Sequence, residues 1–256
     1  MPDSTAGLRD ALISLSADLA AFHDMAIAGE GNVSGALSDG RFLVKASGTD
    51  LGHLKPEHLV EVHAAPLLDA MSGSEALSDA EIESLLLEAR VDDEALKPSV
   101  ESLFHAWLLQ LEGVGVVGHT HPMAVNALLC STRAQAYASR RLFPDQVVYC
   151  GPESVVVPYV DPGLVLAQEI ARLVEAYRER SGIQPKLILI ENHGAIALGR
   201  TETDVRAAMM MAEKSARVFI DASTLGGPVF MTPDQVARID GRIDEHYRQR
   251  MLHDAR

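Results

Sequence analysis

Cysteine is scarce in this sequence, and the cysteines present give no sign of a disulfide scaffold. Cys130 and Cys150 are the only two among 256 residues, and they do not form a CxxC pair. A chain of this length buries roughly 70 to 75% of its unfolded surface, so its core is large enough to be stable without cross-links. We therefore expect a protein that works in a reducing compartment.

Long apolar runs are also absent, and basic residues are few. No 18 consecutive residues are apolar, and residues 1–12 contain no basic region followed by an apolar stretch, so we expect neither a transmembrane helix nor a signal peptide. Lys and Arg number 22 against 36 Asp and Glu, and the net charge of −14 is spread along the chain. Such a field repels nucleic acid and anionic membranes. We expect a cytoplasmic protein with neither as a partner.

The apolar residues, 47% of the chain, recur at helical or strand spacing. Spacings of three and four predict helices at 8–22, 82–87, 99–111, 123–130, 163–180, 202–222 and 233–252. Short apolar runs predict strands at 33–37, 41–46, 59–63, 114–118, 147–149, 155–159, 186–191 and 195–198. Asp39-Gly40, between the first two strands, favours a hairpin and therefore antiparallel pairing.

Together these elements predict an α/β fold with a single domain over residues 1–256. We expect three layers in the order α/β/α, with a mixed, largely antiparallel central sheet between the helices. The stretch at about 71–97 is acidic and rich in serine. We interpret it as a surface excursion from this domain.

Two histidines stand where a predicted strand ends. His119 and His121 follow the apolar run 114–118, and Pro122 stops the strand after them. In an extended segment, residues i and i+2 point to the same face, so both imidazoles could reach one cation. A histidine pair alone is a weak motif, and two histidines at the surface or the core edge are the alternative.

A third histidine and a carboxylate strengthen the metal hypothesis. His193 also follows a predicted strand, and Gly194 after it lets backbone or ligand approach closely. Three imidazoles would leave a tetrahedral zinc ion one open position, which is the arrangement of catalytic zinc sites. Glu101, in the first turn of the helix predicted from 99, could complete the centre. The alternative is an acid that only stabilises the helix N-terminus.

Five ordered motifs carry a resemblance to a known family. They are Glu30-Gly31-Asn32-Val33-Ser34, Ala46-Ser47-Gly48-Thr49, Pro98-Ser99-Val100-Glu101, His119-Thr120-His121-Pro122 and Asn192-His193-Gly194. In this order they resemble the zinc-dependent class II aldolase and adducin family, over a span from the first helix to about residue 222. The resemblance implies one zinc ion per chain, or another divalent metal, bound by His119, His121 and His193. It implies that Glu101 is the catalytic acid/base and can also coordinate the metal.

The resemblance also implies a substrate site and an assembly. The residues that would hold a substrate phosphate are Gly31, Asn32, Ser47, Gly48 and Ser99. Tyr149 weakly resembles a catalytic tyrosine that the aldolases contribute near a neighbouring subunit's site, although a core tyrosine is the alternative. Family members form fourfold rings, so a homotetramer is expected.

Two departures from the family pattern bear on the phosphate. This chain has Glu30 in the first loop and Val100 in place of a second serine. A carboxylate beside a phosphate is repulsive unless Lys45, Arg41 or His53 offsets it. Val100 belongs to the apolar stripe of the helix at 99–111, so we expect it to be buried and to offer only its backbone N–H.

The expected function is that of a zinc-dependent aldolase. Such an enzyme reversibly cleaves a ketose phosphate, or a related sugar, into a dihydroxyacetone-phosphate-type fragment and an aldehyde through a zinc-stabilised enediolate. Glu101 favours this reaction, because the epimerase branch resembles the aldolases but carries Asp there. The alternatives are an epimerase or decarboxylase on the same metal site, or a non-catalytic adducin-like binding module. The presence of all three histidines and Glu101 speaks against the binding module.

Overall fold

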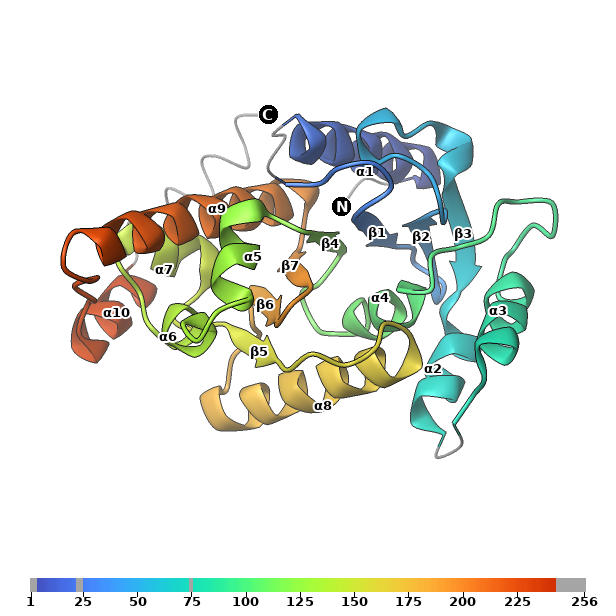
Figure 1. Ribbon diagram of the computed structural model, residues 1–256. Helices are drawn as coiled ribbons and strands as arrows, with labels where there is room; N and C mark the ends of the chain where they lie inside the picture. The colour runs from blue at the N-terminus through green and yellow to red at the C-terminus, as the bar shows by residue number, and fades with distance from the viewer. Residues whose placement is uncertain (1–3, 22–24, 74–75, 243–256) are drawn as a thin grey trace.

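A seven-stranded sheet forms the middle layer of the protein, whose computed structural model describes residues 4–21, 25–73 and 76–242 (Figure 1). The strands are β1 (Asn32–Ala36), β2 (Arg41–Lys45), β3 (Leu59–His63), β4 (Val116–Thr120), β5 (Val155–Val157), β6 (Leu187–Ile190) and β7 (Gly194–Gly199). Their order is β3-β2-β1-β4-β7-β6-β5. Within the described residues, only the β5–β6 pair is parallel. The prediction of a mixed, largely antiparallel sheet is therefore confirmed.

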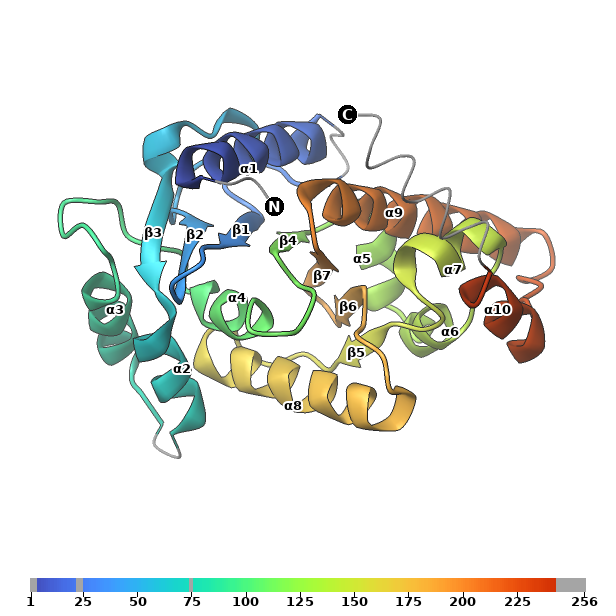
Figure 2. The ribbon, with the colours of Figure 1, turned by 180° about the vertical axis from the view of Figure 1, so that it is seen from behind.

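Helices cover both faces of this sheet (Figures 1 and 2). One face is covered by α1 (Thr5–Ala20), α5 (Met123–Leu129), α6 (Ala134–Ser139) and α9 (Glu202–Thr224). The other is covered by α2 (Ala64–Ser72), α3 (Asp79–Glu88), α4 (Ser102–Leu108) and α8 (Leu164–Ser181). The side chains of strand β6 point alternately to the two faces of the sheet. Leu187 and Leu189 join the core on the first face, and Ile188 and Ile190 join the core on the second. The three-layer α/β/α prediction is confirmed.

The remaining helical elements are short. They are the 3₁₀ turns η1 (Leu51–His53) and η2 (Pro56–His58) and the helices α7 (Pro144–Cys150) and α10 (Pro233–Asp240). Helix α1 begins at the Ser4 cap, whose hydroxyl accepts a hydrogen bond from the Gly7 N–H, and it buries the predicted leucine stripe. Phe22, at the end of that stripe, lies outside the described residues, as does the predicted helix beyond residue 242. In the described chain, no helix is both long and apolar enough to cross a membrane.

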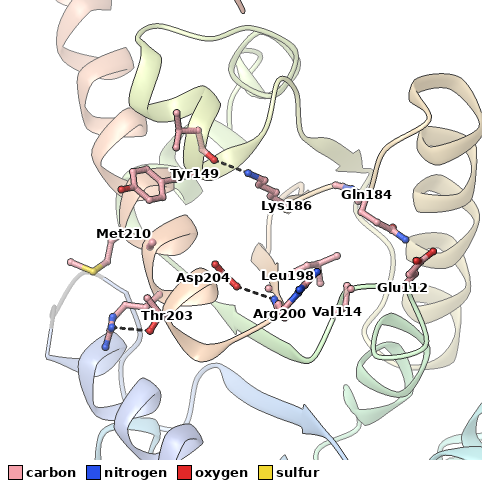
Figure 3. A pocket seen from close by; sticks show the side chains of 16 residues that line it. Glu112, Val114, Tyr149, Gln184, Lys186, Leu198, Arg200, Thr203, Asp204 and Met210 are labelled. Atoms are coloured by element: carbon pink, nitrogen blue, oxygen red, sulfur yellow. Dashed lines mark hydrogen bonds between the residues drawn. The ribbon is translucent and has the colours of Figure 1, made fainter. Parts of the chain in front are cut away.

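The predicted strand at 147–149 is wrong, because this segment belongs to helix α7 (Figure 3). The run Val147-Val148-Tyr149 is typical of strands, but Pro144 occupies the first helical turn, where its fixed φ favours a helix. Val147 and Val148 are then buried, and Lys186 Nζ donates a hydrogen bond to the Val148 carbonyl at 2.7 Å. Packing has overridden the local propensity.

The acidic stretch at 71–97 is more than a surface excursion. Its helix α3 begins at a capping box in which Ser78 and Glu81 exchange hydrogen bonds. The helix exposes its acidic side chains but buries Ile82 and Leu86 in the same core cluster as α4 and α8. The stretch therefore covers one end of the sheet and contributes to the core.

Candidate metal and substrate site

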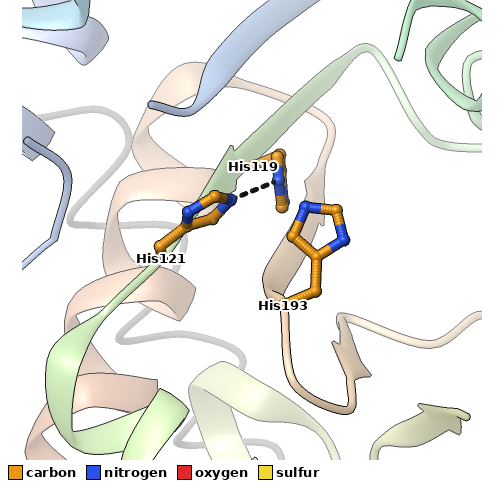
Figure 4. A group of neighbouring side chains, drawn as sticks. All are labelled: His119, His121 and His193. Carbon is orange, nitrogen blue, oxygen red and sulfur yellow. Dashed lines mark hydrogen bonds between the residues drawn. The ribbon is translucent and has the colours of Figure 1, made fainter. Parts of the chain in front are cut away.

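The ends of two antiparallel strands bring the three predicted histidine ligands together (Figure 4). Strand β4 ends at Thr120 and pairs with the start of β7, so that Thr120 lies opposite Ala195. His121 directly follows β4, and His193 directly precedes β7. The two chain segments therefore meet at one edge of the sheet, where His119 already lies.

The nitrogen atoms of these histidines converge on one point. Nε2 of His119 and Nε2 of His121 are 3.1 Å apart, and the three ring centroids are 4.9 to 5.0 Å from one another. One ligand atom from each ring lies within 4.8 Å of the others. His119 and His121 are within hydrogen-bonding distance of each other, and the three rings together form a group that could hold a metal ion.

Glycine at position 194 is required for this convergence. A Cβ atom there would lie 2.6 Å from the Thr120 carbonyl oxygen and 2.7 Å from Cδ2 of His121. Gly31 has a similar role in the first loop, where its φ is +72° and an added Cβ would lie 2.7 Å from the His119 carbonyl oxygen, which excludes other residues. Both glycines let backbone segments approach the histidines more closely than any side chain would allow.

The chemistry of the histidines fits a metal ion. Nδ1 of His119 donates to the Ala195 carbonyl at 3.0 Å, so the lone pair of Nε2 points into the cluster. Burial lowers the pKa of His119 to about 4 and also lowers the pKa of His121, which keeps both rings in the neutral form that a metal requires. Three imidazoles are a donor set that suits zinc and leaves it an open position.

Glu101 lies against two of the candidate metal-binding histidines. It precedes α4 as the N-cap residue, and Oε1 of its carboxylate is 3.5 Å from Nε2 of His119 and 3.3 Å from Nε2 of His193. Burial alone would raise the pKa of Glu101, but the neighbouring His119 and His193 and a hydrogen bond from Asn32 together lower it. The side chain is therefore a carboxylate, placed either to coordinate the ion or to exchange a proton with a bound substrate.

A buried hydrogen-bond chain holds Glu101 in this position, and the sequence analysis did not find it. Asn32 Nδ2 donates to Oε2 of Glu101, His105 Nε2–H donates to Asn32 Oδ1, and the Ser34 hydroxyl donates to Nδ1 of His105 at 2.6 Å. Burial lowers the pKa of His105 to about 3, so the ring is neutral. The available signal was the spacing, because His105 follows Glu101 by four residues and so lies one helical turn later.

The residues predicted to hold a phosphate come from three loops that lie near Glu101. Asn32 and Gly31 adjoin His119 on the neighbouring strand, since Asn32 pairs directly with His119. Ala46 bridges to Pro98, and the Ser47 N–H donates to the Lys97 carbonyl at 2.8 Å. This bridge brings the Ser47-Gly48 loop beside Ser99, whose hydroxyl accepts a hydrogen bond from the Glu101 N–H.

Two expectations about the family departures change with the structure. Val100 is 37% exposed rather than buried, because α4 begins only at Ser102 and the apolar stripe starts beyond Val100. Glu30 turns toward the histidine cluster, with Oε2 accepting from the Ile27 N–H at 3.0 Å and Oε1 lying 3.6 Å from Nδ1 of His121. A carboxylate on the far nitrogen of a ligand histidine is a common way to orient the ring.

Tyr149 is far from the histidines of its own chain. It lines a cavity of about 470 Å³ together with Val114, Leu198 and Gly199, at the opposite end of β4 and β7 from the histidines (Figure 3). At about 3.3 Å per residue, the six residues of β7 separate the two ends by roughly 17 Å. Within one chain, therefore, the structure does not bring Tyr149 to the site.

Comparison with known proteins gives the family. Residues 10–220 match the model of the class II aldolase and adducin N-terminal domain. The chain belongs to this family. A curated relative, the 3-oxo-tetronate 4-phosphate decarboxylase of Haemophilus influenzae, is 27% identical over 220 residues, which cover 84% of this chain and 88% of the relative.

Two further comparisons show less, because one covers a small part of the relative and the other has low sequence identity. The uncharacterized oxidoreductase YuxG of Bacillus subtilis is 29% identical over 158 residues, or 62% of this chain, but this chain spans only 20% of YuxG. Among solved structures, L-fuculose 1-phosphate aldolase superimposes with a TM-score of 0.71, covering 93% of this chain and 96% of that one at 18% identity. This likeness shows a shared fold of the class II aldolase type.

Replacing Gly194 with Ala should lower the affinity for metal more than it lowers the free energy of unfolding. The added methyl group would push His121 and the Thr120 carbonyl apart, and overpacking of this kind costs about 1 to 3 kcal/mol, or roughly 10- to 100-fold in affinity. Competition with a chelator of known affinity measures the change. Gly73→Ala is the matched control, because its Cβ would make only ordinary contacts. Unchanged metal affinity in Gly194→Ala would contradict the assigned centre.

Replacing His105 with Phe should lower kcat while leaving the metal in place. Phe keeps the ring stack on Phe104 but removes the donor to Asn32, so Glu101 loses its orientation, an effect of roughly 10- to 100-fold for such supporting residues. His105→Gln, which retains an N–H donor, should recover part of the loss. Ser102→Ala is the control, since no described residue bonds that buried hydroxyl. An equal loss in all three variants would indicate general destabilisation instead.

Proposed function

We propose that this chain is a metal-dependent lyase that cleaves a carbon–carbon bond beside a carbonyl group in a sugar phosphate. The convergence of His119, His121 and His193 with the Glu101 carboxylate carries the proposal. A divalent metal bound there, for which zinc fits best, would supply a Lewis acid that offsets negative charge developing in the substrate. Family membership and the named relatives support the same class of reaction.

Glu101 is the proton carrier in this proposal. When an aldol bond is cleaved, the Glu101 carboxylate takes the proton from the hydroxyl on the departing carbon, which leaves as an aldehyde. The electron pair of the broken bond moves toward the carbonyl-bearing fragment. Protonated Glu101 returns a proton to the fragment, and the carboxylate removes that proton in the condensation direction. Proton transfer by a positioned side chain contributes about 100- to 10,000-fold. The hydrogen bond from Asn32 directs the other carboxylate oxygen away from the metal ligands.

Decarboxylation is the second candidate, and one observation favours it. Relatives of similar length to this chain are named as 3-oxo-tetronate 4-phosphate decarboxylases. In that reaction the bond to a carboxylate breaks, carbon dioxide leaves, and the remaining carbon takes a proton from Glu101, which receives it from solvent water. The same electron pair is stabilised at the same site, so the leaving group alone distinguishes the two reactions. The intact ligand set speaks against a non-catalytic, adducin-like module.

The decisive assay incubates zinc-loaded protein with a ketose 1-phosphate and, separately, with a 3-oxo sugar acid 4-phosphate. Aldehyde release identifies an aldolase, and carbon dioxide release identifies a decarboxylase. Glu101→Gln should lower kcat at least about 100-fold in whichever reaction occurs, because the proton carrier is lost. Its zinc content, measured by elemental analysis, should stay near one ion per chain, whereas His121→Ala should lose the ion. Normal turnover by Glu101→Gln would refute the assigned role.

A homotetramer is part of the proposal, because Tyr149 can take part in catalysis only across a subunit boundary. In such an assembly, the face of α7 that carries Tyr149 would lie against a neighbouring chain. Sedimentation at assay concentration should therefore give a closed oligomer, the usual form of soluble assemblies. Tyr149→Phe should lower kcat in the oligomer without changing its mass. A fully active monomer would remove both the tetramer and the role of Tyr149.

A further inference from the structure

The ladder between β4 and β7 stops short of two of the three histidines. Its last described pair is Thr120 with Ala195, so His121 and His193 lie just beyond the paired residues. A metal site keeps its affinity only when its ligands are held close to the productive geometry. Another part of the fold must therefore fix the separation between these two segments.

His193 also lacks the support that the other two rings have. Nδ1 of His119 donates to the Ala195 carbonyl, and Glu30 lies beside Nδ1 of His121. Nδ1 of His193 is buried and has no hydrogen-bond partner among the described residues. A ligand histidine is normally oriented through its second nitrogen, so the His193 ring depends on the placement of its backbone instead.

Helix α5 supplies a link to that backbone. Nδ2 of Asn126 donates a hydrogen bond to the His193 carbonyl at 2.9 Å. The Asn126 N–H donates to the carbonyl of Pro122 at 2.8 Å, and Pro122 directly follows His121. The turn that Asn126 holds contains Asn192 at a φ of +56°, in the left-handed region that most residues avoid. One short helix thus joins the segment of His121 to the segment of His193.

A buried carboxylate on α9, which packs against α5, holds the start of this helix (Figure 1). Pro122, the N-cap residue of α5, gives it no side-chain hydrogen bond. Instead Oε2 of Glu213 accepts from the N–H groups of Ala124 and Val125, at 3.0 and 3.4 Å. Glu213 is 5% exposed, and its Oε1 accepts from Nε of Arg217 at 2.7 Å. A negative charge at a helix N-terminus is stabilising, so this contact fixes where α5 begins.

We infer that Asn126 and Glu213 are positioning residues of the metal centre, which set the separation of His121 and His193 through helix α5. Glu213 fixes the start of the helix beside His121, and Asn126 fixes the His193 turn against the same helix. This role rests on the proposed function, since the metal that it secures is the metal of the proposed lyase. Loss of either contact leaves the three imidazoles in place in the sequence but less well held in space, which lowers the affinity for the ion.

The test measures zinc affinity by competition with a chelator of known affinity, and the visible absorption of the cobalt(II)-substituted protein, which reports the geometry of the ligands. Asn126→Leu removes the donor at similar size, and Glu213→Leu removes the acceptor. Glu213→Gln keeps an oxygen acceptor for the α5 N–H groups and tests rescue. Ser131→Ala is the matched control, because the Ser131 hydroxyl donates to the Leu128 carbonyl at the opposite end of α5. Melting temperatures of the metal-free proteins measure stability separately.

Asn126→Leu and Glu213→Leu should each bind zinc roughly 10- to 100-fold more weakly than wild type and should change the cobalt spectrum, as expected for residues that support metal ligands. Glu213→Gln should keep most of the affinity, and Ser131→Ala should match wild type. In the double Leu variant the loss should be smaller than the product of the two separate losses, because both residues act through one helix.

Wild-type zinc affinity and an unchanged cobalt spectrum in Asn126→Leu would overturn the inference and leave the proposed lyase intact, even if the variant melts at a lower temperature. Equal weakening by Ser131→Ala would also overturn it, because loss of helix stability alone would then explain the effect. Independent losses in the double variant would overturn the common route through α5. Failure of wild type to bind either metal would overturn the metal centre and with it the proposed function. Should Glu213→Leu not fold, Asn126→Leu alone decides.

Discussion

The pairing of β4 with β1 on one side and β7 on the other is the constraint on which the site depends. In this register His119 lies opposite Asn32 on one neighbour and Ile196 on the other. Because side chains alternate along a strand, a slip of one residue in either pair would turn His119 toward the wrong face of the sheet. The backbone ladder therefore places His119 beside Asn32, which bonds Glu101, and beside the turn that carries His193.

The histidines were predictable because their positions depend on local rules. Strand alternation puts His119 and His121 on one face, and an apolar run followed by a histidine and a glycine marks the strand end at His193. Other features depend on packing between distant segments. Residues 147–149 form a helix because α7 packs in the α9 layer, and Val100 is exposed because α4 begins later than its apolar stripe suggests. Pro144 is a local signal for the helix, but the strand propensity of residues 147–149 opposes it, so packing decides the outcome.

The proposed function requires a chain with a net charge of −14 to accept an anionic substrate, so the charges of the groups in the site matter. Burial lowers the pKa of His119 and of His121 and so favours their neutral forms, Glu30 is turned toward His121, and Lys45 is held between two loops. Charges outside the site are screened over about 8 Å at physiological ionic strength, so the groups that contact the substrate matter more than the overall charge. Composition excluded nucleic acid as an expected partner, but it carried no information about this local balance.

The chain from Ser34 through His105 and Asn32 to Glu101 explains why polar residues occupy positions where the core pattern would favour apolar ones. All but Glu101 are almost completely buried, and a partly satisfied polar network in a core costs more than an apolar one. Here each member has a donor or acceptor matched to the next, which leaves one consistent arrangement of hydrogen atoms. The network ends on Glu101, whose carboxylate lies beside His119 and His193. The apolar contacts that this part of the core lacks are therefore replaced by hydrogen bonds that orient Glu101, the proposed proton carrier.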